Sequence, residues 1–231
     1  GEEEDITVGH NGHRYTVVGT IPKRKNRCRL SLSIDRPDAL FVQELTDRLR
    51  LSGINIGGEN RPGDSPVETT LLRYPSDSLA YWIRSLNIRS DNLYAESLLR
   101  HLALLFQKTG SAKDGIARIR QYWQPLGADS LELFLYDGSG LARNNKISAR
   151  YLARVLEKTA QNTSIAETFV QSLPLVGKEG SVASFMRDNK LPGELRLKSG
   201  SMSDVLAYAG YYTTPYNRYA IVILVNNYTC K

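Results

Sequence analysis

The C-terminal end of the chain contains three consecutive segments with strand patterns, and these constrain the fold more than any other feature. Residues 194–200 alternate apolar and polar side chains, and residues 205–214 and 219–226 are rich in aromatic and β-branched side chains. Turns at residues 201–204 and 215–218 separate them. Because connections this short join antiparallel neighbours, the pattern predicts a three-stranded antiparallel sheet.

The middle of the chain has helical periodicity instead. We expect a helix over residues 79–86, capped by Ser76 or Asp77 and interrupted at residues 87–89. A second helix over residues 93–107 is expected to bury one apolar stripe: Leu98, Leu102, Leu105 and Phe106.

Four further helices and one short strand complete this middle part of the chain. The helices are expected over residues 113–123, 149–159, 164–173 and 181–188, and the strand over residues 131–136. Helices in the middle with strands at the end indicate an α+β domain of layered helices and antiparallel sheet.

The N-terminal part has a different pattern, which suggests a second domain. Residues 6–8 and 14–21 flank an Asn-Gly turn and predict a β-hairpin, followed by a strand over residues 29–35. A helix is expected over residues 38–51, and the Gly-, Pro- and Asn-rich residues 55–66 form a connection. A further strand is expected over residues 67–74. We therefore predict one domain over residues 1–60 and another over residues 61–231.

Composition and charge exclude few functions. The net charge of +6 suits an anionic partner. The densest basic run, residues 23–29, has no interleaved aromatic side chains, so a turn explains it better than a nucleic-acid interface. Residues 219–225 form the longest apolar run and are too short to span a bilayer. The acidic residues 1–5 are no signal peptide, and we expect a processing boundary there.

Cysteine and histidine spacing indicates no metal site. Cys28 and Cys230 lie near opposite ends of the chain, and the sequence leaves open whether they pair. His10 and His13 flank the Asn-Gly turn, where a hairpin explains them better than a metal.

Two short motifs indicate chemistry only in combination. Ser90, Asp91 and Asn92 alone are typical of the start of a helix. The sequence Lys198-Ser199-Gly200 alone is typical of a strand that ends in a solvated lysine and a turn. A Ser-x-Asn between two helices, followed about a hundred residues later by Lys-Ser/Thr-Gly on a strand, matches two of the three motifs of the penicillin-recognising serine enzymes.

The residues around both motifs narrow the match to one family. Residues 89–100, 136–141 with Ser148-Ala149, and 197–211 resemble the class C low-molecular-mass penicillin-binding proteins, the serine-type D-alanyl-D-alanine carboxypeptidase/endopeptidases. The resemblance covers residue 67 to the end. It implies a β-lactamase/transpeptidase-like α+β fold over residues 61–231, and it implies that residues 1–60 are the tail of an inserted, β-rich domain.

The resemblance also implies a role for each motif residue. The Ser90 hydroxyl would relay a proton to the leaving amine, and Asn92 would hydrogen-bond the amide carbonyl of the substrate. Lys198 would attract the terminal carboxylate of the substrate. The three residues that follow Lys198 would bind substrate: the Ser199 hydroxyl would hold this carboxylate, Gly200 would allow close approach, and the Ser201 N–H would supply half of an oxyanion hole.

The implied biology is that of cell-wall processing. Partners would be peptidoglycan stem peptides as substrates and β-lactam antibiotics as inhibitors, with no metal, cofactor or nucleic acid. The implied location is the periplasm or another extracytoplasmic part of the cell envelope, with possible peripheral association with it. The residues around Asp137, Gly138 and Ser148 are expected to be structural.

One departure from the family pattern concerns the nucleophile. The family's reactive serine lies in a Ser-x-x-Lys motif, and no serine in this chain is followed three positions later by lysine. We therefore expect a C-terminal fragment of a longer enzyme, inactive by itself. A non-catalytic cell-wall-binding or interaction module of the same fold is the main alternative. A β-lactamase or esterase ranks below it, and nucleic-acid binding ranks last.

Overall fold

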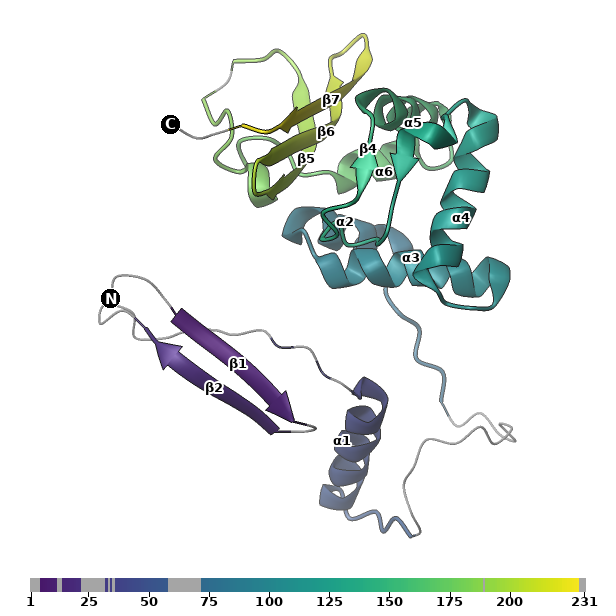
Figure 1. Ribbon diagram of the computed structural model, residues 1–231. Coiled ribbons are helices and arrows are strands. Elements are labelled where there is room, and N and C mark those ends of the chain that lie inside the picture. The colour runs from purple at the N-terminus through teal and green to yellow at the C-terminus, as the bar shows by residue number, and fades with distance from the viewer. Residues whose placement is uncertain are drawn as a thin grey trace. The chain divides into compact units, whose positions relative to one another are not determined.

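The computed structural model describes residues 5–11, 14–21, 32, 34, 36–57, 72–188 and 190–228. They form two compact units, Gly1–Arg73 and Tyr74–Lys231, which we describe separately (Figure 1). Cys28, Cys230 and the basic run at residues 23–29 lie outside the described residues, so the cysteine pairing stays open.

The first unit contains the predicted hairpin and helix. Strands β1 (Asp5–Asn11) and β2 (Arg14–Thr20) pair antiparallel, as the Asn-Gly turn predicts. Helix α1 (Pro37–Leu51) begins with a proline in its first turn and ends before Gly53, which has a φ of +81°. Of the strand expected over residues 29–35, the structure describes only residues 32 and 34, in no regular element.

The second unit is built on the predicted three-stranded sheet. Strands β5 (Glu194–Met202), β6 (Val205–Thr213) and β7 (Arg218–Asn226) pair antiparallel in the order β5-β6-β7. This confirms the three predicted strands and leaves β5 at an edge of the sheet.

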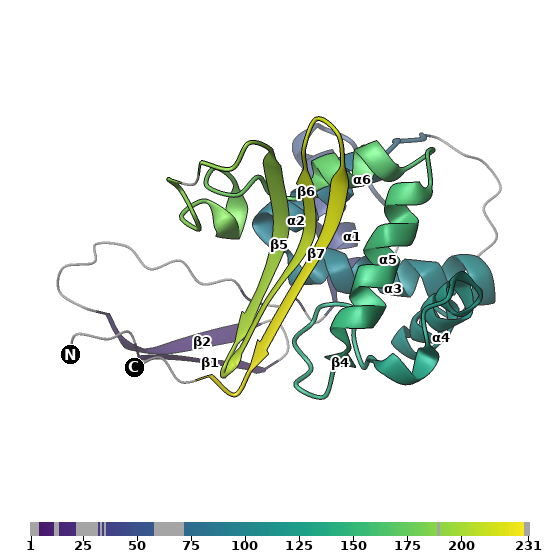
Figure 2. The same ribbon diagram turned by 90° about the horizontal axis from the view of Figure 1, so that it is seen from above.

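Helices cover one face of this sheet. Figure 2 shows α5 (Ala149–Gln161) and α6 (Ala166–Ser172) on the same side of the strands. Tyr211 of β6 is 1% exposed between these helices and donates a 2.7 Å hydrogen bond from its hydroxyl to the Leu156 carbonyl. Burial raises the pKa of this hydroxyl to about 12.

A second cluster of apolar side chains packs against β5. Leu195 and Leu197 of β5 contact Val176 and Val182, and Val182 is fully buried. Side chains alternate between the two faces of a strand, so the residue between the two leucines, Arg196, points to the opposite face. The segment around Val176 and Val182 therefore covers the face of β5 that the helices α5 and α6 do not.

The described part of the second unit contains three further α-helices and three short 3₁₀ helices. They are α2 (Leu79–Arg89), α3 (Asn92–Gln107) and α4 (Ala112–Trp123), with short 3₁₀ helices at Gln124–Leu126, Ser130–Glu132 and Gly180–Val182. Strands β3 (Leu133–Phe134) and β4 (Lys146–Ile147) form a two-stranded sheet. The unit thus mixes helices with antiparallel sheets, and the α+β prediction is confirmed.

Several predicted details about the start of this unit are wrong. Ser78, not Ser76 or Asp77, caps α2, since its hydroxyl accepts the Tyr81 N–H at 3.3 Å. Residues 87–89 continue α2 and do not interrupt it. The polar Asn87 side chain can be buried in this helix because it donates a 3.0 Å hydrogen bond to the Ser172 hydroxyl. Of the strand expected over residues 67–74, residues 72–74 belong to no regular element, and residues 67–71 lie outside the described residues.

The buried face of α3 also differs from the prediction. The helix buries Leu99 and Ala103, whereas Leu105 and Phe106 are each 56% exposed. The reason is the close approach of Gly115 of α4, where an added Cβ would lie 2.4 Å from the Leu99 carbonyl oxygen. Because α4 approaches α3 closely at Gly115, the side of α3 that carries Leu99 and Ala103 is buried, and the side that carries the larger Phe106 stays exposed.

Two other predicted elements are shorter than expected. The strand expected over residues 131–136 contains only Leu133–Phe134, because a 3₁₀ turn occupies Ser130–Glu132. The helix expected over residues 181–188 is wrong beyond the 3₁₀ turn at Gly180–Val182. Met186, with a φ of +48°, has a left-handed backbone that no α-helix accommodates.

Candidate active site

Ser90 occupies the corner between two helices. It ends α2 in a left-handed conformation, with φ 56° and ψ 48°, and its backbone N–H donates to the Leu86 carbonyl. The side chain of Asp91 caps α3 by accepting the Tyr94 N–H at 3.0 Å. Left-handed backbone is uncommon outside glycine. Two helix ends therefore hold Ser90 in place, and Asn92 is the exposed first residue of α3.

Lys198 of β5 contacts Ser90 directly. Its ammonium Nζ lies 2.7 Å from the Ser90 Oγ and also donates to the Ser199 carbonyl oxygen at 2.5 Å. Among the described residues, no carboxylate forms an ion pair with Lys198. Burial lowers the pKa of this ammonium group, because the charged form loses hydration. Lys198 thus supplies a partly desolvated positive charge that an anionic ligand can neutralise.

The backbone of β5 offers hydrogen-bonding groups at the same edge. The Leu197 N–H donates outward to the Pro174 carbonyl, and the Leu195 carbonyl accepts from the Val176 N–H. Alternate residues of a strand direct their N–H and C=O groups the same way, so those of Ser199 and Ser201 also face outward. In the part of the chain described, neither makes a further backbone–backbone hydrogen bond on that side, and the Ser199 carbonyl accepts from the Lys198 ammonium. The N–H groups of this stretch of edge are open to an extended peptide.

The hydroxyl of Ser199 contacts a residue that the sequence did not single out. The Ser181 Oγ lies 2.5 Å from the Ser199 Oγ. Ser181 follows Gly180 in a segment predicted as a helix, and its spacing from either motif carries no signal. Only the folding of this segment against β5 brings the two hydroxyls together.

An ion-pair network ties α2 to β5 beside these residues. The Glu179 carboxylate contacts Arg84 of α2 at 2.7 Å and Arg196 of β5 at 3.6 Å, and it accepts the Leu175 N–H at 2.9 Å. Burial raises the pKa of the Glu179 carboxyl, but the hydrogen bonds and the two guanidinium charges outweigh it, so the pKa lies below its ordinary value. The network therefore links α2, which ends at Ser90, to β5, which carries Lys198.

The loop after β3 makes contacts within itself and to α3. The Asp137 carboxylate accepts from the Gly140 and Ala142 N–H groups and from the Asn145 amide, and the Gly138 N–H donates to Glu96 at 2.7 Å. Ser148 caps α5 by accepting the Tyr151 N–H at 2.9 Å. These contacts account for Asp137, Gly138 and Ser148 as structural residues.

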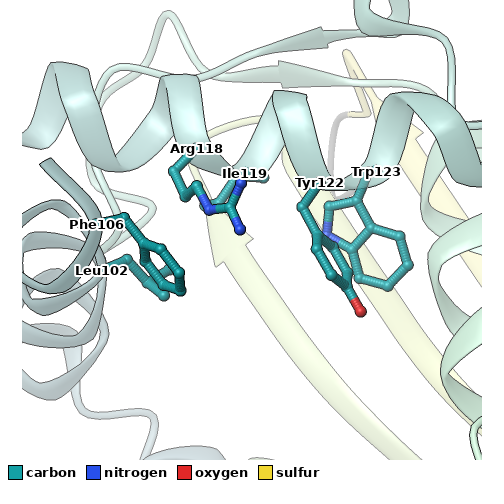
Figure 3. Close-up of a pocket in the computed structure, with 6 residues that line it drawn as sticks. All are labelled: Leu102, Phe106, Arg118, Ile119, Tyr122 and Trp123. Carbon is teal, nitrogen blue, oxygen red and sulfur yellow. The ribbon is translucent and has the colours of Figure 1, made fainter.

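A separate pocket lies between α3 and α4. It has a volume of about 260 Å³ and a mainly apolar lining: Leu102, Phe106, Arg118, Ile119, Tyr122 and Trp123 (Figure 3). The Arg118 guanidinium lies 4.3 Å from the centre of the Phe106 ring. None of the motif residues lines this pocket.

The described part of the chain has neither a metal-ligand cluster nor a membrane-spanning helix. It contains no cluster of three His, Cys, Asp or Glu side chains placed to hold a metal ion. None of its helices has the length and apolar character needed to cross a bilayer.

The chain is similar in sequence to known D-alanyl-D-alanine carboxypeptidases. D-alanyl-D-alanine carboxypeptidase of Actinomadura sp. is 27% identical over 97% of this chain and 43% of its own length. D-alanyl-D-alanine carboxypeptidase DacB of Haemophilus influenzae is 28% identical over 97% of this chain and 48% of its own length. The chain thus spans about half the length of the curated relatives it matches.

Solved structures agree. The crystal structure of penicillin binding protein 4 from Haemophilus influenzae matches 99% of this chain and 51% of its own chain, with a TM-score of 0.83 and 26% identity. A second structure of that protein, complexed with a β-lactam, matches with a TM-score of 0.82. Residues 2–231 match the D-Ala-D-Ala carboxypeptidase 3 (S13) family, and the chain therefore belongs to it.

Proposed function

We propose that this chain supplies the substrate-binding half of a serine-type D-Ala-D-Ala carboxypeptidase/endopeptidase that acts on peptidoglycan stem peptides. The observation that carries the proposal is the 2.7 Å contact between the Lys198 ammonium and the Ser90 hydroxyl beside an open strand edge. An extended peptide that ends in a carboxylate matches both the positive charge and the edge.

Each motif residue has a defined task in this reaction. A serine hydroxyl attacks the carbonyl between the two D-Ala residues, the D-Ala amine leaves with a proton, and water then hydrolyses the ester. Ser90 relays the proton to the leaving amine. Asn92 hydrogen-bonds the amide carbonyl of the substrate. Lys198 and the Ser199 hydroxyl hold the terminal carboxylate.

The strand edge has the remaining tasks. The outward Ser201 N–H donates to the oxyanion that forms during attack, and the absence of a side chain at Gly200 lets the substrate approach the backbone. Among the described residues, an added Cβ at Gly200 would meet only the Ala207 side chain within 4 Å, at 3.8 Å, so the face of β5 at Gly200 is unobstructed there.

The reacting serine belongs, in this proposal, to a Ser-x-x-Lys motif in another part of a longer protein. Loss of the nucleophile typically lowers the rate of a serine hydrolase by roughly a millionfold. We therefore propose that residues 1–231 alone are inactive, that residues 1–60 are the tail of an inserted domain, and that the protein works in the cell envelope outside the cytoplasm. β-Lactams are the proposed inhibitors, since a related protein was crystallised with one.

Covalent labelling with a fluorescent penicillin tests this function. Residues 1–231 should stay unlabelled, whereas a longer protein that carries an upstream Ser-x-x-Lys should form a stable adduct at that serine. Labelling of residues 1–231 would contradict the assignment of the nucleophile. Absence of any Ser-x-x-Lys from the complete gene would instead favour a non-catalytic, cell-wall-binding module.

A further inference from the structure

The Ser181 hydroxyl is in hydrogen-bond contact with the Ser199 hydroxyl, a group that the proposed function assigns to ligand binding. Their oxygens are 2.5 Å apart, and Ser199 directly follows Lys198, whose ammonium contacts Ser90. A serine side chain has three staggered rotamers and no branch at Cβ to select one. Something outside Ser199 must therefore fix the direction of its hydroxyl, and Ser181 is the group in contact with it.

Ser181 itself is held by its neighbours on both sides. Gly180 has a φ of +54°, and an added Cβ there would lie 2.6 Å from the Ile88 carbonyl oxygen near the end of α2. Val182 on the other side is fully buried, and its carbonyl accepts the Gly177 N–H at 2.9 Å. The backbone on both sides of Ser181 is therefore anchored, and its exposed side chain reaches the Ser199 hydroxyl at the edge of the site.

Either hydroxyl can be the donor in this contact, and the direction decides what Ser199 can offer a ligand. Each hydroxyl has one donor and two acceptor sites. When Ser181 donates to the Ser199 oxygen, the hydrogen of Ser199 is left for a ligand. Successive hydroxyl donors polarise each other, which strengthens the last bond to an anionic oxygen.

We propose that Ser181 is a positioning residue, which orients the Ser199 hydroxyl to donate to the ligand's carboxylate. The inference rests on the proposed function, because it assumes that a carboxylate occupies this edge beside Lys198. It deepens that function by naming a residue outside both sequence motifs that favours anionic over neutral peptide ends.

The test compares two ligands by NMR titration of residues 1–231: N-acetyl-D-Ala-D-Ala and its C-terminal amide. Ser181→Ala should weaken binding of the acid about fivefold and leave binding of the amide unchanged, because only the acid uses the oriented hydroxyl. Ser181→Cys keeps the side-chain size but is a weak donor, and should behave like Ser181→Ala. Ser181→Thr should restore binding of the acid.

A double-mutant cycle separates positioning from simple packing. The β-branch of threonine restricts its own rotamer, so in a Ser199→Thr background Ser181→Ala should weaken binding of the acid less than about twofold. Ser164→Ala is the matched control: that exposed hydroxyl donates to the Asn162 side chain, away from the motif residues, and its loss should leave the binding of both ligands unaffected.

Three results would overturn the inference. Unchanged binding of the acid by both Ser181→Ala and Ser181→Cys removes the positioning role. Equal losses for acid and amide show a structural role only. A wild-type chain that binds the acid no better than the amide refutes the proposed carboxylate site, and this inference with it. If Ser181→Ala does not fold, the Ser181→Cys titration decides.

Discussion

The Lys198 Nζ lies 2.7 Å from the Ser90 Oγ although 108 positions separate the two residues in the chain. One atom belongs to an edge strand and the other to the corner between two helices, so neither element alone creates the contact. The Glu179 carboxylate, between Arg84 of α2 and Arg196 of β5, connects the same two elements. The site is therefore a property of how helix and strand pack together.

Replacement of the lysine should abolish selection for an anionic ligand. Lys198→Met removes the positive charge, and we expect binding of N-acetyl-D-Ala-D-Ala to weaken by roughly 10- to 100-fold, the value of a hydrogen bond to a charged group. Binding of the C-terminal amide should change little. Lys198→Arg should recover part of the loss, since its charge is kept but its geometry differs. Equal effects on acid and amide would argue against a carboxylate contact.

The pH dependence of the same binding reports the state of Lys198. Burial lowers its pKa from 10.5, so the ammonium loses its proton at a lower pH than an ordinary lysine. Affinity for the acid should be highest below the pKa of Lys198 in the folded protein. It should fall as the pH rises through that pKa, which lies below 10.5. Lys198→Met should not show this fall in affinity, and an unchanged fall in that variant would assign the titration to another group.

Substitution of Gly180 should disturb both the fold and the site. Gly180→Ala adds a Cβ 2.6 Å from the Ile88 carbonyl oxygen in a backbone with φ +54°. We expect a loss of about 2–3 kcal/mol in the free energy of unfolding, measured by urea denaturation. Gly140→Ala is the control: its φ is +80° and nothing lies within 4 Å of the added Cβ. It should cost only about 1–2 kcal/mol, from backbone strain. Equal losses would rule out the contact with Ile88 as a cause.

Neutralisation of Glu179 should weaken the link between α2 and β5. Glu179→Gln should lower the free energy of unfolding by about 1–2 kcal/mol at neutral pH, because both arginines lose a charged partner. Glu167→Gln removes the partner of Arg218, a carboxylate that is 65% exposed, and should cost no more than about 0.5 kcal/mol.

Stability against pH gives a second measurement of Glu179. The pKa of its carboxyl lies below 4.5 in the folded protein, so its contribution is present above pH 4.5 and is lost as the pH falls through the folded value. The melting temperature of the wild type should therefore fall more steeply than that of Glu179→Gln in this acid range. Parallel curves would show that Glu179 contributes nothing to the acid sensitivity.

Local sequence patterns predicted most of the second unit. Strands β5, β6 and β7 and helices α3, α4 and α5 match their expected ranges within three residues, because apolar periodicity and turn residues act over a few neighbours. The predicted helix over residues 181–188 failed where local periodicity conflicted with packing. Val182 and Phe185 contact the sheet instead, and Met186 adopts a left-handed backbone.

The sequence by itself determined which residue types the site contains, through the two motifs that include Ser90 and Lys198. The tertiary structure alone decided that these two side chains touch, that the outer edge at Ser201 is open, and that Ser181 reaches Ser199. Local propensity carries no information about contacts between segments far apart in the chain. Those contacts depend on close approaches such as that of Gly180 to Ile88, which arise only when the packed elements meet.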